Sequence, residues 1–173
     1  MSLLSIAKWN YERNKLEYRA ELEDAMYAEE VKEYKDGLEV YLSNPLTKLE
    51  CIVDMVDGYC DATFVHYGTI AKQLGHTKLS DRNYELSIMN TIITEILVTH
   101  KVKMYVDEGY STIDMCMQAV INANQAKPKS KTKGKVVKGN EWVDPKVVIT
   151  ELLIDRGFEE YPNEVEVKEA DGN

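Results

Sequence analysis

The segment 49–75 carries a row of acidic side chains on an otherwise apolar sequence, and this row limits the structures that the segment can adopt. Its members follow one another at intervals of three or four residues: Glu50, Asp54, Asp57 and Asp61. At about 100° per residue, the four positions fall within a sector roughly 60° wide on an α-helix. The residues around the row are those of a buried helix: Ile52, Val53, Met55, Val56, Cys60, Phe64, Val65 and Ile70. A carboxylate in apolar surroundings is unfavourable unless it is paired or binds a metal, so the segment predicts a helix that carries a site.

A second acidic cluster lies about one helix earlier, in YAEEVKEY, where Glu30 and Glu33 fall one turn apart on the same helix face. Asp54 and Asp57 repeat this spacing on the next helix. If the two helices pack antiparallel, the four carboxylates converge on a point between them. Oxygen ligands of this kind suit Mg²⁺ or Mn²⁺, which would leave positions for water and substrate phosphates. We therefore expect these four residues to bind a divalent cation.

Plainer interpretations exist for parts of this pattern. The stretch 29–33 on its own is typical of a solvated helix face. Glu50 follows Thr47 by three residues, which is the spacing of a helix capping box. The sequence supports metal binding and helix capping by Glu50 equally.

Length and charge favour one globular domain, since the chain has 173 residues and a net charge of −9. We assign residues 1–158 to this domain, with a basic loop at 125–141, and expect 159–173 to be an acidic, mobile tail. The negative charge argues against a stable nucleic-acid complex. No run reaches the roughly 18 apolar residues of a membrane span, and we read no signal peptide. The chain has three cysteines, and none of them forms a CxxC pair, so we expect reduced thiols. Reduced thiols are typical of the cytoplasm, where we expect the protein to be located.

Apolar periodicity predicts an all-α chain, a bundle of four to five helices, because strand-like alternation is weak throughout. The predicted helices cover 11–36, 47–73, 81–105, 111–124 and 145–156, with a break over Gly37–Pro45 and a helix end near Gly75. Ser111 or Thr112 opens the fourth helix. Asp144 is the predicted N-cap of the last helix, with Pro145 in its first turn and Gly157 at its end.

The helix at 81–105 carries more apolar residues than one packed face needs, namely Ile88, Ile92, Ile93, Ile96 and Leu97. Such a surplus predicts burial between subunits, as a homodimer or homotetramer.

Several metal and catalytic motifs are absent. A di-iron bundle needs Glu-x-x-His pairs, and none of the three histidines has Glu three residues before it. EF-hand spacing and the GxxxxGK[ST] phosphate loop are also missing. His66 points away from Asp61 around the helix, so we interpret it as a core or interface residue. The lysine-rich stretch KPKSKTKGKVVKG has three open interpretations: a solvated loop, a phosphate clamp or a nucleic-acid contact.

The order of these segments resembles one family. EEVKE followed by DMVD resembles the EExxE…ExxD signature of the MazG-like all-α nucleotide pyrophosphohydrolases. DGYCDATFVHYGTIAKQLG is similar to a helix of the branch related to phosphoribosyl-ATP pyrophosphohydrolase, which includes many phage-encoded members. The matching positions there are Asp57, Asp61, Phe64, Val65, Gly68 and Thr69. NANQAK and GKVVKG resemble the SNMSK and GKVxKG segments of that branch. The resemblance covers roughly residues 20–75 and 115–145.

The resemblance implies Mg²⁺- or Mn²⁺-dependent hydrolysis of a nucleoside triphosphate to the monophosphate and pyrophosphate. We expect a purine deoxynucleotide, such as dGTP or dATP, as the preferred substrate. The resemblance also implies metal ligands at Glu30, Glu33, Asp54 and Asp57, with Glu50 as a further candidate. Glu29 or Asp61 would orient water or hold a second ion. Substrate contacts carry over to Asn124, Lys127, Lys135 and Lys138. The family also implies assembly as a dimer or a dimer of dimers.

The chain departs from the family pattern at three places. Asp54 stands where the family has Glu, and Glu50 one turn earlier would supply the missing reach. Ala123 and Ala126 replace the two serines of SNMSK, and 80–110 is longer than expected. Two alternatives to the triphosphate substrate are phosphoribosyl-ATP and a nucleotide alarmone. A third alternative is a non-catalytic helical module that binds a partner protein.

Overall fold

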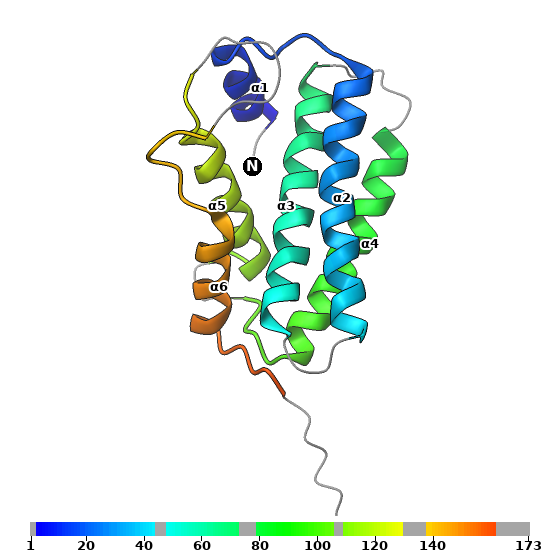
Figure 1. Ribbon diagram of the computed structural model, residues 1–173, viewed down its shortest axis with the longest axis vertical. Helices are drawn as coiled ribbons and strands as arrows, with labels where there is room; N and C mark the ends of the chain where they lie inside the picture. The colour runs from blue at the N-terminus through cyan, green and yellow to red at the C-terminus, as the bar shows by residue number, and fades with distance from the viewer. Residues whose placement is uncertain (1–2, 44–47, 73–78, 106–108, 130–137, 162–173) are drawn as a thin grey trace, which may run out of the picture.

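The computed structural model describes residues 3–43, 48–72, 79–105, 109–129 and 138–161. Within these ranges the chain forms six α-helices and no strand, which confirms the all-α prediction (Figure 1). The helices are α1 (Leu3–Glu12), α2 (Ala20–Ser43), α3 (Leu49–Lys72), α4 (Leu79–Thr99), α5 (Thr112–Gln125) and α6 (Pro145–Asp155). None of the helices in these ranges is long and apolar enough to cross a membrane.

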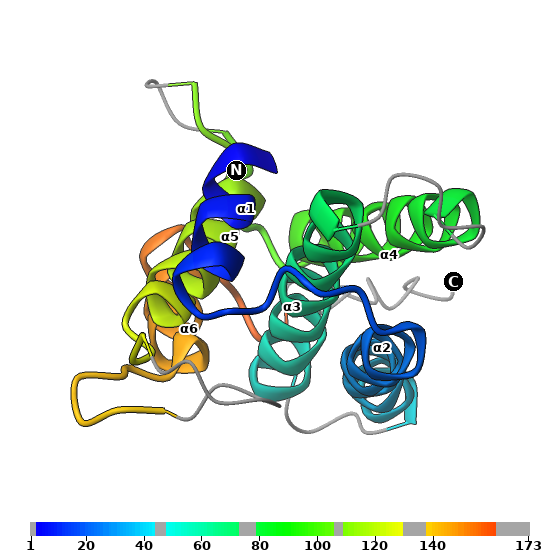
Figure 2. The same cartoon turned by 90° about the horizontal axis from the view of Figure 1, so that it is seen from above.

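Helix α3, the predicted carrier of the acidic row, lies at the centre of the fold. It contacts each of the other five described helices, with α1, α5 and α6 on one side and α2 and α4 on the other (Figure 2). Its apolar residues form the middle of the core, and Ile52, Val56 and Cys60 are almost fully buried. The acidic row therefore lies on a helix that is packed on most of its circumference.

Helices α2 and α3 run antiparallel, and two glycines allow them to approach closely. A Cβ at Gly37 would lie 2.8 Å from the Cys51 carbonyl oxygen, and a Cβ at Gly58 would lie 2.8 Å from the Tyr34 nitrogen. The predicted break at Gly37 is therefore wrong, since α2 continues to Ser43. A glycine inside a helix is unfavourable by about 1 kcal/mol relative to alanine. Here its small size serves the contact between helices.

The predicted helix at 11–36 is in fact two helices that meet at an angle. α1 ends at Glu12, and Asn14 follows with φ of 54°, a left-handed conformation that Asn tolerates better than most residues. α2 begins only at Ala20. The prediction missed α1 because it placed Tyr11 and the residues after Asn14 in one continuous helix.

The predicted ends of the last two helices are confirmed. Ser111 caps α5, and its hydroxyl accepts a hydrogen bond from the Asp114 nitrogen at 3.0 Å. Asp144 caps α6 and accepts from the Lys146 nitrogen at 3.0 Å. Gly157 has φ of 93°, as expected for a glycine that ends a helix. α4 spans 79–99 and ends six residues before its predicted end.

The chain's own core covers most of the apolar surplus on α4. Ile93, Ile96 and Leu97 are 1%, 8% and 0% exposed, and Ile92 packs against the same core. Only Ile88, at 42% exposure, remains a candidate for a subunit contact from this set. These side chains therefore do not provide the surplus surface from which assembly was predicted, and homo-oligomerisation stays a prediction.

Some residues named in the sequence analysis lie outside the described residues. They are Thr47, Gly75, Lys131, Lys133, Lys135 and the tail after residue 161.

Candidate functional site

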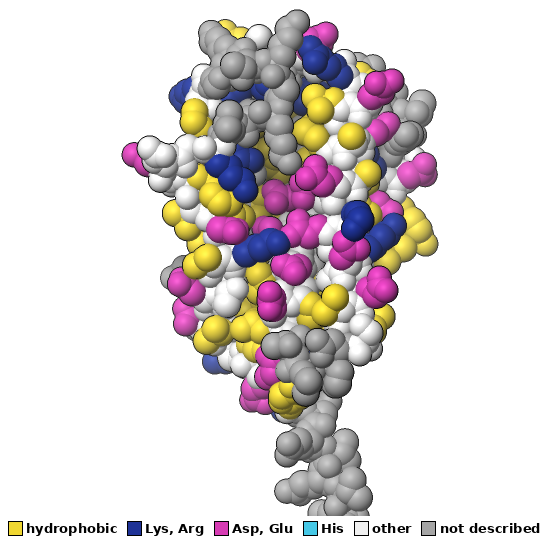
Figure 3. All heavy atoms as spheres, in the orientation of Figure 1, with side chains coloured by type: hydrophobic (Ala, Val, Ile, Leu, Met, Phe, Trp, Pro, Cys, Tyr) yellow, Lys and Arg dark blue, Asp and Glu magenta, His cyan; other side chains and the backbone are white. Residues whose placement is uncertain are grey.

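Two of the predicted metal ligands share one cation, Lys146. Its ammonium donates to Glu33 on α2 and to Asp54 Oδ1 on α3, the latter at 3.0 Å. Both ion pairs are partly exposed. Acidic side chains gather on the middle of the face formed by α2, α3 and α6, with basic side chains among them (Figure 3). The structure therefore brings Glu33 and Asp54 to the same point, as predicted.

The start of α6 places Lys146 at this point. Asp144 caps the helix, and Pro145, which is buried, occupies its first position. Lys146 is the next residue, on the first turn of a helix that packs against α3. Burial alone would lower the pKa of Lys146, but its hydrogen bonds to Glu33 and Asp54 outweigh burial and raise that pKa. The side chain is therefore held as a cation.

Asp57 is the most buried carboxylate of the row. It is 5% exposed, and its Oδ1 atom accepts no hydrogen bond from the described residues. Burial, and then the charges of Asp61 and Glu33, raise the pKa of Asp57 to about 8, while Lys146 acts in the opposite direction. An unpartnered buried oxygen is unfavourable in a folded protein. A cation close to Asp57 would relieve this cost.

An open pocket of about 540 Å³ is lined by Glu33 and Asp54, the two partners of Lys146, and we call it the acidic pocket. It is lined by Glu29, Lys32, Glu33, Asp36, Gly37, Val40, Glu50, Cys51 and Asp54. Three of the five predicted metal ligands, Glu33, Glu50 and Asp54, thus line one pocket. Among the described residues, no three potential ligands are already grouped closely enough to hold an ion. The donor set fits a hard divalent cation, since every candidate ligand is a carboxylate and Asp57 has an unpartnered oxygen.

A second, smaller cavity of about 120 Å³ lies between α1, α2, α3 and the end of α5, and we call it the apolar cavity. Glu30 and Asp61 line it, together with two predicted substrate contacts, Asn124 and Lys127. Lys127 Nζ donates to Asn124 Oδ1 at 2.9 Å. The remaining lining residues are Trp9, Asn10, Lys15, Leu22, Glu23, Met26, Phe64, Val65, Gly68 and Lys72. The predicted residues are thus divided between two neighbouring cavities, with Asp57 on the acidic row between them.

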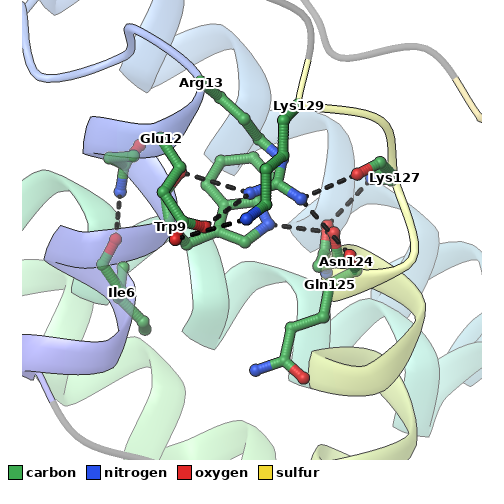
Figure 4. Close-up of polar contacts among 9 residues, drawn as sticks. Ile6, Trp9, Glu12, Arg13, Asn124, Gln125, Lys127 and Lys129 are labelled. Carbon is green, nitrogen blue, oxygen red and sulfur yellow. Dashed lines mark hydrogen bonds and ion pairs between the residues drawn. The ribbon is translucent and has the colours of Figure 1, made fainter.

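Trp9 on α1 and Arg13, the residue directly after that helix, hold the end of α5 in place (Figure 4). Trp9 Nε1 donates to the Asn124 carbonyl oxygen at 2.9 Å. Arg13 is 1% exposed and donates to the carbonyl oxygens of Gln125 and Lys127, at 3.3 and 2.7 Å. Its guanidinium also lies over the Trp9 ring, 4.6 Å from the centroid. These contacts position Asn124 and Lys127 at the apolar cavity.

Not every predicted residue reaches the two cavities. Lys138 lines neither, and its ammonium lies 3.9 Å from the centroid of the Trp142 ring. Lys135 lies outside the described residues. His66 is 1% exposed and bonds Asn83 Oδ1 through Nε2 at 2.7 Å, which confirms its interpretation as a core residue.

Sequence reasoning missed Lys146, Trp9 and Arg13. Lys146 is 92 residues from Asp54 along the chain, and it has no local motif that marks it as a partner. Trp9 lies on α1, which was not predicted, and Arg13 directly follows that helix, within the range 11–36 that was predicted as one continuous helix. An isolated tryptophan and arginine one turn apart were the only available signal.

Comparisons with known proteins add no family assignment: no family model, curated protein or solved structure matches the chain.

Proposed function

We propose that this protein is a metal-dependent nucleoside triphosphate pyrophosphohydrolase, which converts a triphosphate, preferably a purine deoxynucleotide, to the monophosphate and pyrophosphate. The observation that carries the proposal is the convergence of Glu33 and Asp54 on one cation, with buried Asp57 beside them. The resemblance of EEVKE, DMVD and the following helix to MazG-like enzymes supports the same reaction. The proposal includes assembly as a homodimer or homotetramer.

The carboxylates on the facing surfaces of α2 and α3 would hold the metal. Glu33, Asp54 and Asp57 are the principal ligands, with Glu30 and Glu50 on either side of them. A bound Mg²⁺ or Mn²⁺ would neutralise phosphate charge and lower the pKa of a coordinated water. Asp57, whose pKa is about 8 without a metal ion, would bind as the carboxylate because a neighbouring positive charge favours its ionised form.

The other polar groups would position the reactants. Glu29 borders the acidic pocket and Asp61 borders the apolar cavity, so either carboxylate is placed to accept a proton from the attacking water. Lys127, held by Asn124 and by the Arg13 contact to its carbonyl oxygen, would neutralise phosphate oxygens. Lys135 and Lys138 are proposed to add positive charge toward the phosphates, as the family resemblance implies. No side-chain nucleophile is required for this reaction.

A substrate screen tests the proposal. The protein is incubated with each common ribo- and deoxynucleoside triphosphate, with Mg²⁺ and with Mn²⁺, and released pyrophosphate and orthophosphate are measured separately. We expect pyrophosphate and the matching monophosphate in equal amounts, with dGTP or dATP turned over fastest. Release of orthophosphate alone would indicate cleavage at the γ-phosphate and would contradict the proposal.

The same assay separates the alternative substrates. Phosphoribosyl-ATP and a nucleotide alarmone are added as further compounds, and a higher kcat/KM for either would reassign the substrate within the same chemistry. A non-catalytic module would release nothing from any compound. Thermal melting with Mn²⁺ adds a test of the metal site, since an ion that binds only the folded state raises the melting temperature.

A further inference from the structure

The groove between α2 and α3 changes chemical character along its length. Near the acidic row, Glu30 and Asp61 face the groove from the two helices. About one turn further along, the lining becomes apolar, with Met26 on α2 and Phe64 and Val65 on α3. This order follows from the antiparallel packing, in which earlier residues of α2 lie beside later residues of α3.

The far end of the groove is polar again. Glu23 and Lys72 form an ion pair there, and their side chains are only 2% and 8% exposed. Thr69 Oγ1 also donates to Glu23 Oε2 at 2.9 Å. A carboxylate has about four acceptor positions and an ammonium has three donors. Both residues also line the apolar cavity, so the pair places a charged donor and a charged acceptor at this end of it.

The size of the apolar cavity limits what it can take. Its volume is about 120 Å³, whereas pockets that enclose a whole drug-sized ligand have roughly 300–1,000 Å³. An apolar protein cavity of about 150 Å³ is known to bind one benzene molecule. The cavity therefore fits one flat ring system and not an entire nucleotide.

The wall of the cavity suits an aromatic ligand. Trp9 and Phe64 meet edge to face, with centroids 5.5 Å apart and an interplanar angle of 89°. Aromatic side chains in this arrangement offer both a ring face and a ring edge to a third ring. Gly68 adds a place where no side chain fills the groove, because the nearest atom to a Cβ there would be Asn10 Nδ2 at 3.8 Å.

We propose that the apolar cavity binds the nucleobase of the substrate, with Phe64, Val65 and Gly68 as its wall and the Glu23–Lys72 pair facing the hydrogen-bonding edge of the base. The proposal rests on the proposed function for the position of the phosphates, which lie toward Asp57 and Lys127. The Glu23 carboxylate is a hydrogen-bond acceptor and the Lys72 ammonium beside it is a donor, a combination that matches the pairing edge of any base. The ligand of this cavity is therefore a nucleobase, and we expect nucleotides to bind more tightly than polyphosphates that have no base.

Gly68→Leu is the variant that tests this assignment. Leucine is a good helix former, and the open space at Gly68 lets its side chain fill the cavity without a backbone clash. Gly68→Ala is the matched control, since it makes the same change in helix propensity and adds only one methyl group. Val65→Phe, one turn earlier on the same wall, is a second way to fill the cavity. Circular dichroism and thermal melting establish that each variant is folded.

Binding is measured by the fluorescence of Trp9. The chain has two tryptophans, so Trp142→Phe is used as the background. The two probes are α,β-methylene dGTP, which is not cleaved at that bond, and inorganic tripolyphosphate, which has no base. We expect Gly68→Leu and Val65→Phe to raise the Kd of the methylene nucleotide at least about tenfold. This is the scale of one lost base-stacking contact. Tripolyphosphate affinity, measured by competition, should change less than about twofold.

The outcomes separate this inference from the proposed function. If wild-type protein releases pyrophosphate and Gly68→Leu retains the same KM, the base lies elsewhere and the inference is overturned, while the proposed function stands. If tripolyphosphate binds wild-type protein as tightly as the methylene nucleotide, the inference is also overturned. If no triphosphate is hydrolysed but Gly68→Leu abolishes the Trp9 response, the base site is supported and the proposed function fails.

Discussion

The ammonium of Lys146 lies 3.0 Å from Asp54 Oδ1, and the same ammonium donates to Glu33. A cation of the protein itself therefore occupies the space between two carboxylates that we propose as metal ligands. A divalent ion at this point would compete with Lys146, since two positive charges in contact repel each other. Metal binding would thus move Lys146 away from at least one of its partners.

Lys146→Met is expected to strengthen metal binding. Without metal, the variant should melt at a lower temperature than wild type because Glu33, Asp54 and Asp57 lose their common cation. With Mn²⁺, its melting temperature should rise by more than that of wild type, which corresponds to roughly tenfold tighter binding. Lys103→Met is the control, since Lys103 is an exposed lysine that does not line the acidic pocket. An equal Mn²⁺ response in wild type and Lys146→Met would show that Lys146 does not compete with the ion.

Asp57 makes the stability of the metal-free protein depend on pH. Burial, followed by the charges of Asp61 and Glu33, raises its pKa from 3.8 to about 8. Between these values the folded state holds a proton that the unfolded chain has released, so stability falls as the pH rises from about 4 to about 8. At pH 8, Asp57→Asn should be more stable than wild type by about 1–3 kcal/mol, or roughly 3–10 °C in melting temperature.

Thermal melting of both proteins in a chelator at several pH values checks this expectation. The gain of Asp57→Asn over wild type should shrink toward pH 4. Asp155→Asn, a change at an exposed position near the end of α6, serves as the control and should follow the wild-type profile. Parallel profiles for wild type and Asp57→Asn would mean that Asp57 is not the group responsible.

Arg13 links α1 to the end of α5, and its removal should affect both stability and substrate binding. Arg13→Met keeps the buried aliphatic stem but leaves the carbonyl oxygens of Gln125 and Lys127 without this donor. The expected loss is about 2–3 kcal/mol in the free energy of unfolding, measured by urea denaturation. KM should rise by more than kcat falls, because Lys127 loses its support. Arg19→Met, at an exposed ion pair with Glu17, should change neither quantity; a similar loss in both variants would contradict the role given to Arg13.

Local periodicity was sufficient to predict α3 and the side on which its carboxylates lie, because both depend only on residue spacing along one helix. The close packing of α2 against α3 could not be predicted from residue spacing. Gly37 resembles a helix end in the sequence, and only its distance of 2.8 Å from the Cys51 carbonyl oxygen explains why a glycine stands inside α2. The role of a glycine is set by its neighbours in space, which the sequence around it does not contain.

The candidate site also combines residues that local spacing predicts with residues that only the packing of distant helices brings in. Glu30, Glu33, Asp54, Asp57 and Asp61 were predicted from their spacing within two helices, and all five lie along the facing surfaces of α2 and α3 or the cavities beside them. Lys146 joins them from a helix 92 residues away from Asp54. Its position depends on how α6 packs against α3. The surplus of apolar residues on α4 was misjudged because the chain's own core buries Ile93 and Leu97 where α4 packs against α3.

Pyrophosphate release by Glu33→Gln tests the central claim most directly, because this change removes one charge from the shared carboxylate site and little else. Glu39→Gln, an exposed change one to two turns later on α2, is the matched control. With the best triphosphate and Mn²⁺, Glu33→Gln should lose at least about 100-fold in kcat, since an amide oxygen is a neutral and weaker ligand. Its melting temperature without metal should stay close to that of wild type, and Glu39→Gln should remain fully active. Activity of Glu33→Gln equal to that of Glu39→Gln would contradict a catalytic metal site between α2 and α3.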